Sequence, residues 1–194
     1  MQGRHLREPA VHPALAACGN EDNIAVRQVG RFDIVVGTRG DLVKSAPLHD
    51  IGKVGIADSI LLKPGTLTPE ERQEIQRHCE MGARVLRIAE KKLKFQSFLT
   101  IAIQLTLYHH EKWDGTGYPN GLAGEAIPLS GRIMALADNY DALRTTRPYK
   151  SAFSHEQSRG IIQENRGTHF DPALVDAFLR READFRRISE ELSD

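Results

Sequence analysis

The sequence predicts an all-α fold, a helical bundle interrupted by one long glycine-rich loop. Capping signals followed by amphipathic runs recur after residue 41, whereas only RFDIVVGT (31–38) reads as a strand. With 194 residues, the chain has the length of one domain that can bury a substantial core. We therefore expect a helical domain over 41–194, preceded by an atypical N-terminal segment over 1–40.

The first strong helix signal is at Thr68, where Pro69 takes the first helical position and Glu71 completes a capping box. The residues that follow place small and apolar side chains at helical spacing, with charged residues between them. This pattern predicts a helix with a single face turned toward the core. The residues of that face are Ile75, Cys79, Gly82, Val85, Leu86 and Ala89.

Two more helices are expected over 97–110 and 129–143, on either side of a loop at 112–128. The loop is rich in glycine and other turn residues, and structureless loops of that length in compact domains are often functional. The helix after the loop carries one stripe of small and apolar residues, formed by Ile133, Ala137, Tyr140 and Leu143.

The C-terminal part of the chain carries two further helix starts. Ser154 and Gln157 form a second capping box, which opens a helix that ends near Gly167. Asp171 before Pro172 is typical of a helix start, and the apolar run ALVDAF follows it. After this helix we expect a charged tail.

The composition excludes some classes of function. The 26 basic and 26 acidic residues cancel, so there is no basic excess of the kind that binds a nucleic acid polymer or an anionic membrane. The most apolar run, FLTIAIQLTLY, is too short to cross a bilayer. Two cysteines cannot form a disulfide framework and are typical of a reducing compartment, so a cytoplasmic location is expected.

Six polar residues lie on or beside the apolar faces of the expected helices, where unpaired imidazoles and carboxylates are rare. Inward-facing imidazoles and carboxylates from separate helices are what a metal site in a helical bundle requires. This donor set suits iron, manganese or zinc better than calcium. The six residues are His49, Asp50, His78, His109, His110 and Asp138.

Each of these residues taken alone has a plainer interpretation. A single histidine on a helix is more often a surface residue or a hydrogen-bonded core residue. Asp138 alone would be a buried carboxylate bonded to a neighbouring helix end. Cys79 is expected to be part of the core, and His5, His12 and His155 are expected at the surface. Only the co-occurrence of the six favours a metal site.

The order and spacing of several motifs are distinctive. The pair His49-Asp50 lies in LHDIGK, the run RHCEMGARVL follows, and the tripeptide Gly117-Tyr118-Pro119 lies in HHEKWDGTGYPNG. ALADNYDALRTTRPYK and GTHFDPALVDAF complete the series. From about residue 46 to 178 the chain resembles the HD-GYP domain, a bacterial branch of the HD metal-dependent phosphohydrolases.

The resemblance implies a helical bundle that hydrolyses cyclic di-GMP to linear pGpG, GMP or both through a metal-activated hydroxide. It implies divalent ions, two in number, with iron or manganese favoured and zinc or nickel acceptable. All six residues above fall on the family's metal-ligand positions. Asp50 and Lys53 fall on catalytic positions, with Lys53 near the scissile phosphate. The positions that match substrate contacts are Gly117, Tyr118, Pro119, Arg147 and Lys150.

The chain departs from the family near its N-terminus. Glu21 aligns with a glutamate that can be a weak additional metal ligand, but Ala25 stands where the family has a histidine ligand. This departure leaves two hypotheses open. The first is an active phosphodiesterase; the second is a degenerate domain that senses nucleotide or binds a protein without turnover. A signalling protein or a second copy of the chain is the partner expected, and hydrolysis of another cyclic dinucleotide is a further alternative.

Overall fold

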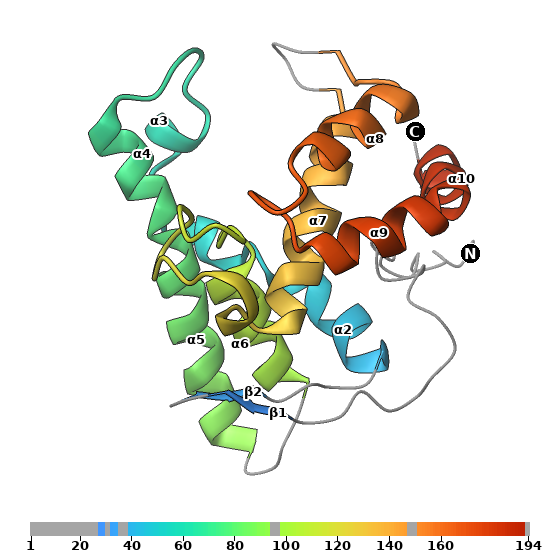
Figure 1. Cartoon of the computed structure of the whole chain (residues 1–194). Helices are drawn as coiled ribbons and strands as arrows, with labels where there is room; N and C mark the ends of the chain where they lie inside the picture. Colours follow the sequence, from blue (N-terminus) through green and yellow to red (C-terminus); the bar gives the residue numbers. More distant parts are fainter. Residues whose placement is uncertain (1–26, 30–31, 35–38, 94–97, 147–150, 193–194) are drawn as a thin grey trace, which may run out of the picture.

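The structure, a computed structural model, describes residues 27–29, 32–34, 39–93, 98–146 and 151–192. The all-α prediction is confirmed, since every helix or strand described from residue 39 onward is helical (Figure 1). None of the described helices is long and apolar enough to span a membrane. The helices are α2 Arg39–Ser45, α3 Asp58–Leu61, α4 Pro69–Gln76, α5 His78–Leu93, α6 Leu99–Tyr108, α7 Leu129–Arg144, α8 His155–Glu164, α9 Pro172–Arg180 and α10 Glu182–Leu192.

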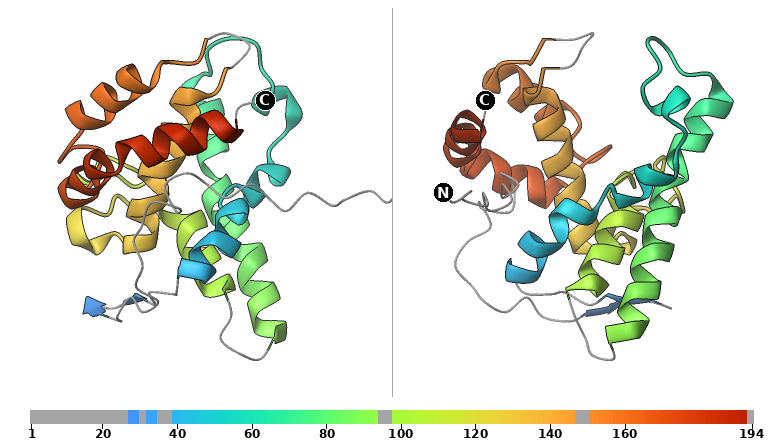
Figure 2. Two further views of the ribbon diagram at one scale, coloured as in Figure 1. Left: turned by 90° about the vertical axis from the view of Figure 1, so that its right-hand side faces the viewer. Right: turned by 180° about the vertical axis from the view of Figure 1, so that it is seen from behind.

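Helix α6 lies at the centre of the bundle. Its sequence, LTIAIQLTLY, has no charged residue, and all but two of its side chains are buried. It contacts α5 on one side and α2 and α7 on the others. Figure 2, seen from behind, shows α5 and α6 packed side by side, with α8, α9 and α10 on the far side of α7. A helix that is apolar on all faces is buried in this way.

Three apolar clusters hold these helices together. One joins α5 to α6 through Ala83, Leu86 and Ala102, and a second joins α2, α6 and α7. The third joins α7 to the C-terminal helices, where Tyr140 is fully buried against Phe178. Because α6 and α7 each take part in two clusters, the ends of these two helices are held firmly. The functional residues described below lie on or next to those helices.

The predicted capping box at Thr68 is confirmed. The Thr68 hydroxyl accepts the Glu71 N–H, and the Glu71 carboxylate accepts the Thr68 N–H. The expected helix is divided at Arg77 into α4 and α5. Cys79 and Leu86 are buried as predicted, but Val85 is 56% exposed. Ala83 and Leu86 form the face of α5 that packs on α6, and Val85 lies outside this face.

The C-terminal tail is a helix, which corrects the prediction of a charged tail. Phe185 in α10 packs edge-on against Phe178 at 4.8 Å and against Tyr140 at 5.5 Å. The charged residues between its apolar positions pair along the helix, as in Arg186–Glu190 and Arg187–Glu191. Residues four apart lie on the same helix face, so these charges stabilise the helix and face solvent.

The expected strand is confirmed in the part of it that the structure describes. Strands β1 (Arg27–Val29) and β2 (Phe32–Ile34) pair as a short antiparallel ribbon. Of the predicted strand over 31–38, residues 32–34 are described and form a strand, and its partner precedes it in the chain. The positions of Glu21, Ala25, Arg147 and Lys150 lie outside the described residues.

Candidate metal centre and substrate loop

The six predicted metal ligands come together beside the C-terminal end of α6. His49 and Asp50 follow a 3-10 turn (η1, Ala46–Leu48) that continues from α2. His78 is the first residue of α5, and His109 and His110 directly follow α6. Asp138 lies in the middle of α7. Four segments far apart in the sequence therefore supply one cluster of side chains.

Backbone carbonyl groups fix the orientation of three of the histidine rings. The Nδ1 atoms of His49, His78 and His109 lie 2.8, 2.7 and 2.9 Å from the carbonyl oxygens of Ala46, Ile75 and Leu105. A carbonyl can only accept a hydrogen bond, so each Nδ1 carries the proton. In a neutral ring the lone pair is then on Nε2, which points into the cluster. A metal-binding histidine is usually held by such a bond.

The inward-pointing atoms are close together. The Nε2 atoms of His78 and His109 are 3.4 Å apart. Asp50 Oδ1 lies 3.3 Å from His78 Nε2 and 3.7 Å from His109 Nε2. This oxygen is buried and has no hydrogen-bond partner among the described residues. A buried carboxylate oxygen without a donor is costly unless a cation compensates it.

The other oxygen of Asp50 faces a second group of ligands. Asp50 Oδ2 lies 3.3 Å from His49 Nε2, and Asp138 Oδ1 lies 3.6 Å from the same nitrogen. Lys53 also forms an ion pair with Asp50 Oδ2. Its side chain is partly exposed, which leaves the ammonium group accessible from outside the cluster. Asp50 thus lies between two groups of donors, one on each of its oxygens.

The electrostatics of the two groups differ. Burial alone would lower the pKa of His49, but the carboxylates of Asp138 and Asp50 outweigh it and raise that pKa to about 10. At His109, burial and the nearby His49 lower the pKa to about 4, so this ring is neutral at pH 7. Burial also lowers the pKa of His110. Burial would raise the pKa of Asp50, but the neighbouring positive charge and hydrogen bond of His49, together with Lys53, hold it well below its usual range.

The donor set fits divalent transition metals. Two groups of side chains could each hold an ion, and they share His109. One group contains His78, His109 and His110, and the other contains His49, Asp50 and His109. Imidazole and carboxylate donors are accepted by iron, manganese and zinc. The orphaned Asp50 Oδ1 supports this fit, because it needs a positive partner that the described protein does not supply.

Cys79 is buried, as the sequence predicts for a core residue. Its Sγ atom nevertheless lies 3.5 Å from His78 Nε2, at the edge of the cluster. Burial and the Asp50 carboxylate raise the pKa of the thiol to about 12, so it is a neutral group in the metal-free protein.

The GYP tripeptide lies directly over the cluster. The ring of Tyr118 stacks on His110 with ring centroids 4.7 Å apart and planes inclined by 27°. The Tyr118 N–H donates to the carbonyl of His110 at 3.2 Å. A Cβ on Gly117 would lie 2.4 Å from the Lys112 nitrogen, so only glycine fits there. The loop therefore folds back onto the segment that carries the histidine pair.

Trp113 and Arg132 hold the loop through contacts that the sequence did not indicate. The Trp113 N–H donates to the carbonyl of His169, and Gly124 N–H donates to that of Trp113. Arg132 in α7 lies over the Trp113 ring at 5.7 Å and pairs with Asp171 at 2.6 Å. Arg132 lies outside the loop in the sequence, so no local pattern indicates its contact with Trp113. The partners come from α7 and the start of α9, which only the fold brings near.

His155 is buried, contrary to the surface position predicted for it. Its Nδ1 lies 3.0 Å from the hydroxyl of Tyr140, because the start of α8 packs on α7. His5 and His12 lie outside the described residues. Residues 138 and 140 lie about 200° apart around a helix of 3.6 residues per turn. His155 of α8 thus lies against the face of α7 that is turned away from Asp138.

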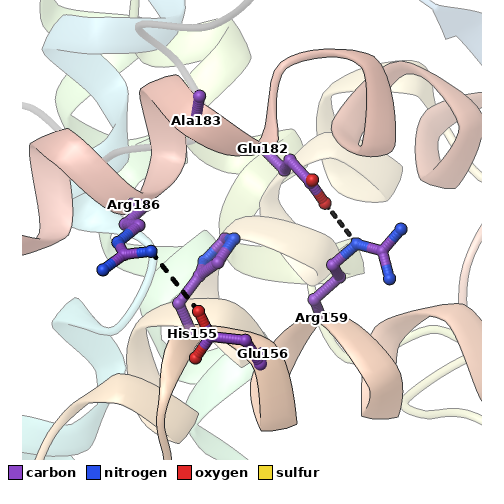
Figure 3. Close-up of a pocket in the computed structure, with 6 residues that line it drawn as sticks. All are labelled: His155, Glu156, Arg159, Glu182, Ala183 and Arg186. Carbon is purple, nitrogen blue, oxygen red and sulfur yellow. Dashed lines mark hydrogen bonds and ion pairs between the residues drawn. The ribbon is translucent and has the colours of Figure 1, made fainter.

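A separate hollow of about 340 Å³ lies between α8 and α10 (Figure 3). Within it Arg159 pairs with Glu182, and Arg186 pairs with Glu156 at 3.4 Å. None of the predicted site residues lines it. Because both arginines are neutralised by glutamates, this hollow offers no free charge to an anionic substrate.

Comparison with known proteins agrees with this geometry. The HD domain family model matches residues 38–174. A cyclic di-GMP phosphodiesterase of Vibrio cholerae is 60% identical over 79% of this chain and 31% of its own length. A 3'3'-cGAMP-specific phosphodiesterase 2 of the same organism is 44% identical over 81% of this chain and 29% of its own length. The chain thus spans about a third of the length of the curated relatives it matches.

A solved structure shows the same fold. The cyclic GMP-AMP specific phosphodiesterase V-cGAP3 of V. cholerae superposes with a TM-score of 0.55 at 25% identity, over 80% of this chain and 41% of that one. The HD pair at His49-Asp50 lies in the cluster of candidate metal ligands, and the GYP tripeptide covers it. With the family match over most of the described chain, this chain belongs to the HD domain family and, within it, to the HD-GYP branch.

Proposed function

We propose that this chain is the catalytic domain of a phosphodiesterase that hydrolyses cyclic di-GMP to linear pGpG, GMP or both. The observation that carries the proposal is Asp50, whose Oδ1 lies near His78 Nε2 and whose Oδ2 lies near His49 Nε2, beneath Tyr118. Two divalent cations, iron or manganese by preference, would be held there by the six predicted ligands. When bound, such ions supply an activated water and neutralise charge on the phosphate.

The protein's own residues would position the substrate. Lys53 pairs with Asp50 and is partly exposed, so its ammonium group can donate to a phosphoryl oxygen at the edge of the centre. Tyr118 is kept as a neutral phenol because burial raises its pKa. Its ring can contact a nucleotide next to the cluster. Arg147 and Lys150 are proposed to meet a phosphate or a guanine edge, which suits the fixed fork of an arginine.

The test is turnover by protein of known metal content. The chain is loaded with Mn²⁺ or, without oxygen, with Fe²⁺, and the metal content is measured before cyclic di-GMP is added. Linear pGpG or GMP is expected as the product, and Asp50→Ala is expected to abolish it. Asp141→Ala is a matched control, because Asp141 is exposed on the same helix as Asp138. Absence of turnover at full metal occupancy would reject the proposal.

That negative result would favour the second candidate, a module that binds nucleotide or a signalling protein without turnover. Ala25 in place of the expected histidine supports this candidate. Calorimetry would then detect binding of cyclic di-GMP without product. Glu21 as a weak ligand, the boundary between 40 and 41, a partner protein or second copy, and a cytoplasmic location stay predictions.

A different substrate is supported by a specific observation. Relatives that are 44% and 41% identical are described as 3'3'-cGAMP-specific phosphodiesterases. The two substrates differ in one base, so base contacts rather than the metal ligands would separate them. Comparing kcat/KM for cyclic di-GMP and 3'3'-cGAMP on the same protein sample decides between them.

A further inference from the structure

Glu111 is a buried carboxylate that the metal centre does not use. It directly follows the histidine pair, and only 1% of its surface is exposed. Its oxygens point away into the loop, where Oε1 accepts the N–H of Asn120 at 2.8 Å and Oε2 accepts the N–H of Leu122 at 3.0 Å. A buried carboxylate is tolerated when charge-assisted hydrogen bonds of this kind compensate it.

These two hydrogen bonds tie the loop back to Glu111, and we call the three residues Glu111, Asn120 and Leu122 the clasp. The N–H groups of Asn120 and Leu122 lie just after the GYP tripeptide, whereas Glu111 lies just before the loop. A third hydrogen bond, from Tyr118 N–H to the His110 carbonyl, ties the tripeptide itself to the same segment. The backbone of the loop is thus bonded to residues 110–111 at Tyr118 and again at Asn120 and Leu122. These bonds keep Tyr118 stacked on His110.

The chemistry of the clasp requires a carboxylate. Each oxygen of Glu111 accepts from a different backbone N–H, so both atoms must be acceptors. A glutamine of nearly the same shape has one acceptor oxygen and one NH₂ group, which is a donor. In Glu111→Gln, one loop N–H would face a second donor and lose its partner. This substitution therefore tests the hydrogen bonds with little change in packing.

We propose that Glu111 is a positioning residue that holds the GYP loop over the metal centre and thereby places Tyr118 against the substrate. It acts through the loop and does not touch the substrate. The proposal rests on the proposed function for its effect on catalysis. Its effect on the loop is independent of that function, because the hydrogen bonds are present without substrate.

The first measurement is hydrogen–deuterium exchange of metal-loaded protein. In Glu111→Gln, the amides of Asn120 and Leu122 should exchange faster, while those of α5, α6 and α7 stay as in the unchanged protein. Glu125→Gln is the matched control, since Glu125 is an exposed carboxylate in the same loop. It should leave exchange unchanged. Unchanged exchange at Asn120 and Leu122 in Glu111→Gln would overturn the proposal, and so would faster exchange throughout the domain.

The second measurement separates positioning from a general structural role. Glu111→Gln should keep its full metal content and a kcat within about twofold, while KM for cyclic di-GMP rises about tenfold, equivalent to about 1.4 kcal/mol. Loss of metal, or a KM equal to that of the unchanged protein, contradicts the proposal. If the unchanged protein has no turnover, the proposed function fails, and the exchange data alone decide the role of Glu111.

A second variant covers the case in which Glu111→Gln does not fold. Glu111→Asp keeps the charge, but its side chain is one methylene shorter and cannot span both N–H groups. It should show faster exchange at one of the two amides and a smaller rise in KM. The fluorescence of Trp113, the only tryptophan, reports on the base of the loop, which is held by His169 and Gly124. Its emission should not change in either variant, and a shift would indicate general unfolding instead.

Discussion

The Nε2 atoms of His78 and His109 face each other across 3.4 Å, although each ring already donates its Nδ1 proton to a backbone carbonyl. In neutral rings both facing atoms are lone pairs, which repel each other unless a positive charge lies between them. Two nitrogens bound to one tetrahedral ion at 2.0–2.1 Å are about 3.4 Å apart. The spacing of this pair therefore matches two ligands of a single metal ion.

Substitution of single ligands should change the metal content in steps. Asp50 faces both donor groups, so Asp50→Ala should lose both ions, whereas Asp138→Ala and His78→Ala should each keep one. The content is measured by elemental analysis after loading with Mn²⁺ and removal of free metal. Asp141→Ala should bind as the unchanged protein does. Full occupancy in Asp50→Ala would refute the shared role of its two oxygens.

Metal affinity should increase with pH because of His49. Its pKa is raised to about 10, so at pH 7 the ring is protonated and must lose that proton before its Nε2 can bind an ion. Displacement of one proton makes the affinity rise about tenfold for each pH unit below that pKa. His109, with a pKa of about 4, is already neutral and adds no slope between pH 6 and 9.

The pH dependence is measured by titration with Mn²⁺ in buffers between pH 6 and pH 9. His49→Gln should bind more weakly and lose most of the slope. His155→Gln, a change at the start of α8, which packs on the face of α7 away from Asp138, should keep the slope of the unchanged protein. A flat affinity profile for the unchanged protein would show that His49 is not displaced by the ion.

Gly117→Ala should damage the loop without unfolding the bundle. The added methyl group would lie 2.4 Å from the Lys112 nitrogen and 2.6 Å from the His110 carbonyl oxygen, so the tripeptide must move. Overpacking of about 1–3 kcal/mol at this point would lower kcat/KM roughly tenfold or more. Gly160→Ala is the control, because a Cβ there meets nothing within 4 Å in the middle of α8. It should be slightly more stable, by about 0.5–1 kcal/mol, with full activity.

Phe185→Ala should show that the C-terminal helix belongs to the core. Removal of a buried phenylalanine typically costs about 3–5 kcal/mol, and Phe185 packs on both Tyr140 and Phe178. Arg187→Ala on the exposed face of α10 should change the free energy of unfolding by less than about 0.5 kcal/mol. Urea denaturation followed by circular dichroism measures both variants. Equal stability of the two would mean that α10 contributes little to the fold.

Local sequence signals predicted the helix starts well, because the bonds that make them are local. Thr68 and Ser154 each lie three residues from their capping partner, so a short stretch determines the contact. The helix α10 was missed because its apolar positions, such as Phe185, have meaning only once the aromatic cluster of α7 and α9 is in place. The break at Arg77 likewise depends on where α5 must meet α6.

The candidate site was predicted as a set of residue types, and the fold supplied their relationships. Their positions on the expected helices selected His78 and Asp138, and the family resemblance agreed, but the division of donors between the two oxygens of Asp50 is visible only in three dimensions. Glu111 and Arg132 were missed because their partners are backbone groups and residues of distant helices. Bonds between positions that only the fold brings together leave no signature in residue type alone.

The carbonyl bonds to the three histidine rings have a further consequence for metal exchange. Those carbonyls belong to helices and turns that the apolar core holds in place, so the donor atoms stay in position when no ion is bound. A zinc finger, by contrast, acquires its shape only on binding its ion. Here one ion could be exchanged for another at a preformed site without refolding of the protein. The identity of the bound metal would then depend on which metals the cell supplies, and the activity of the protein would change with that supply.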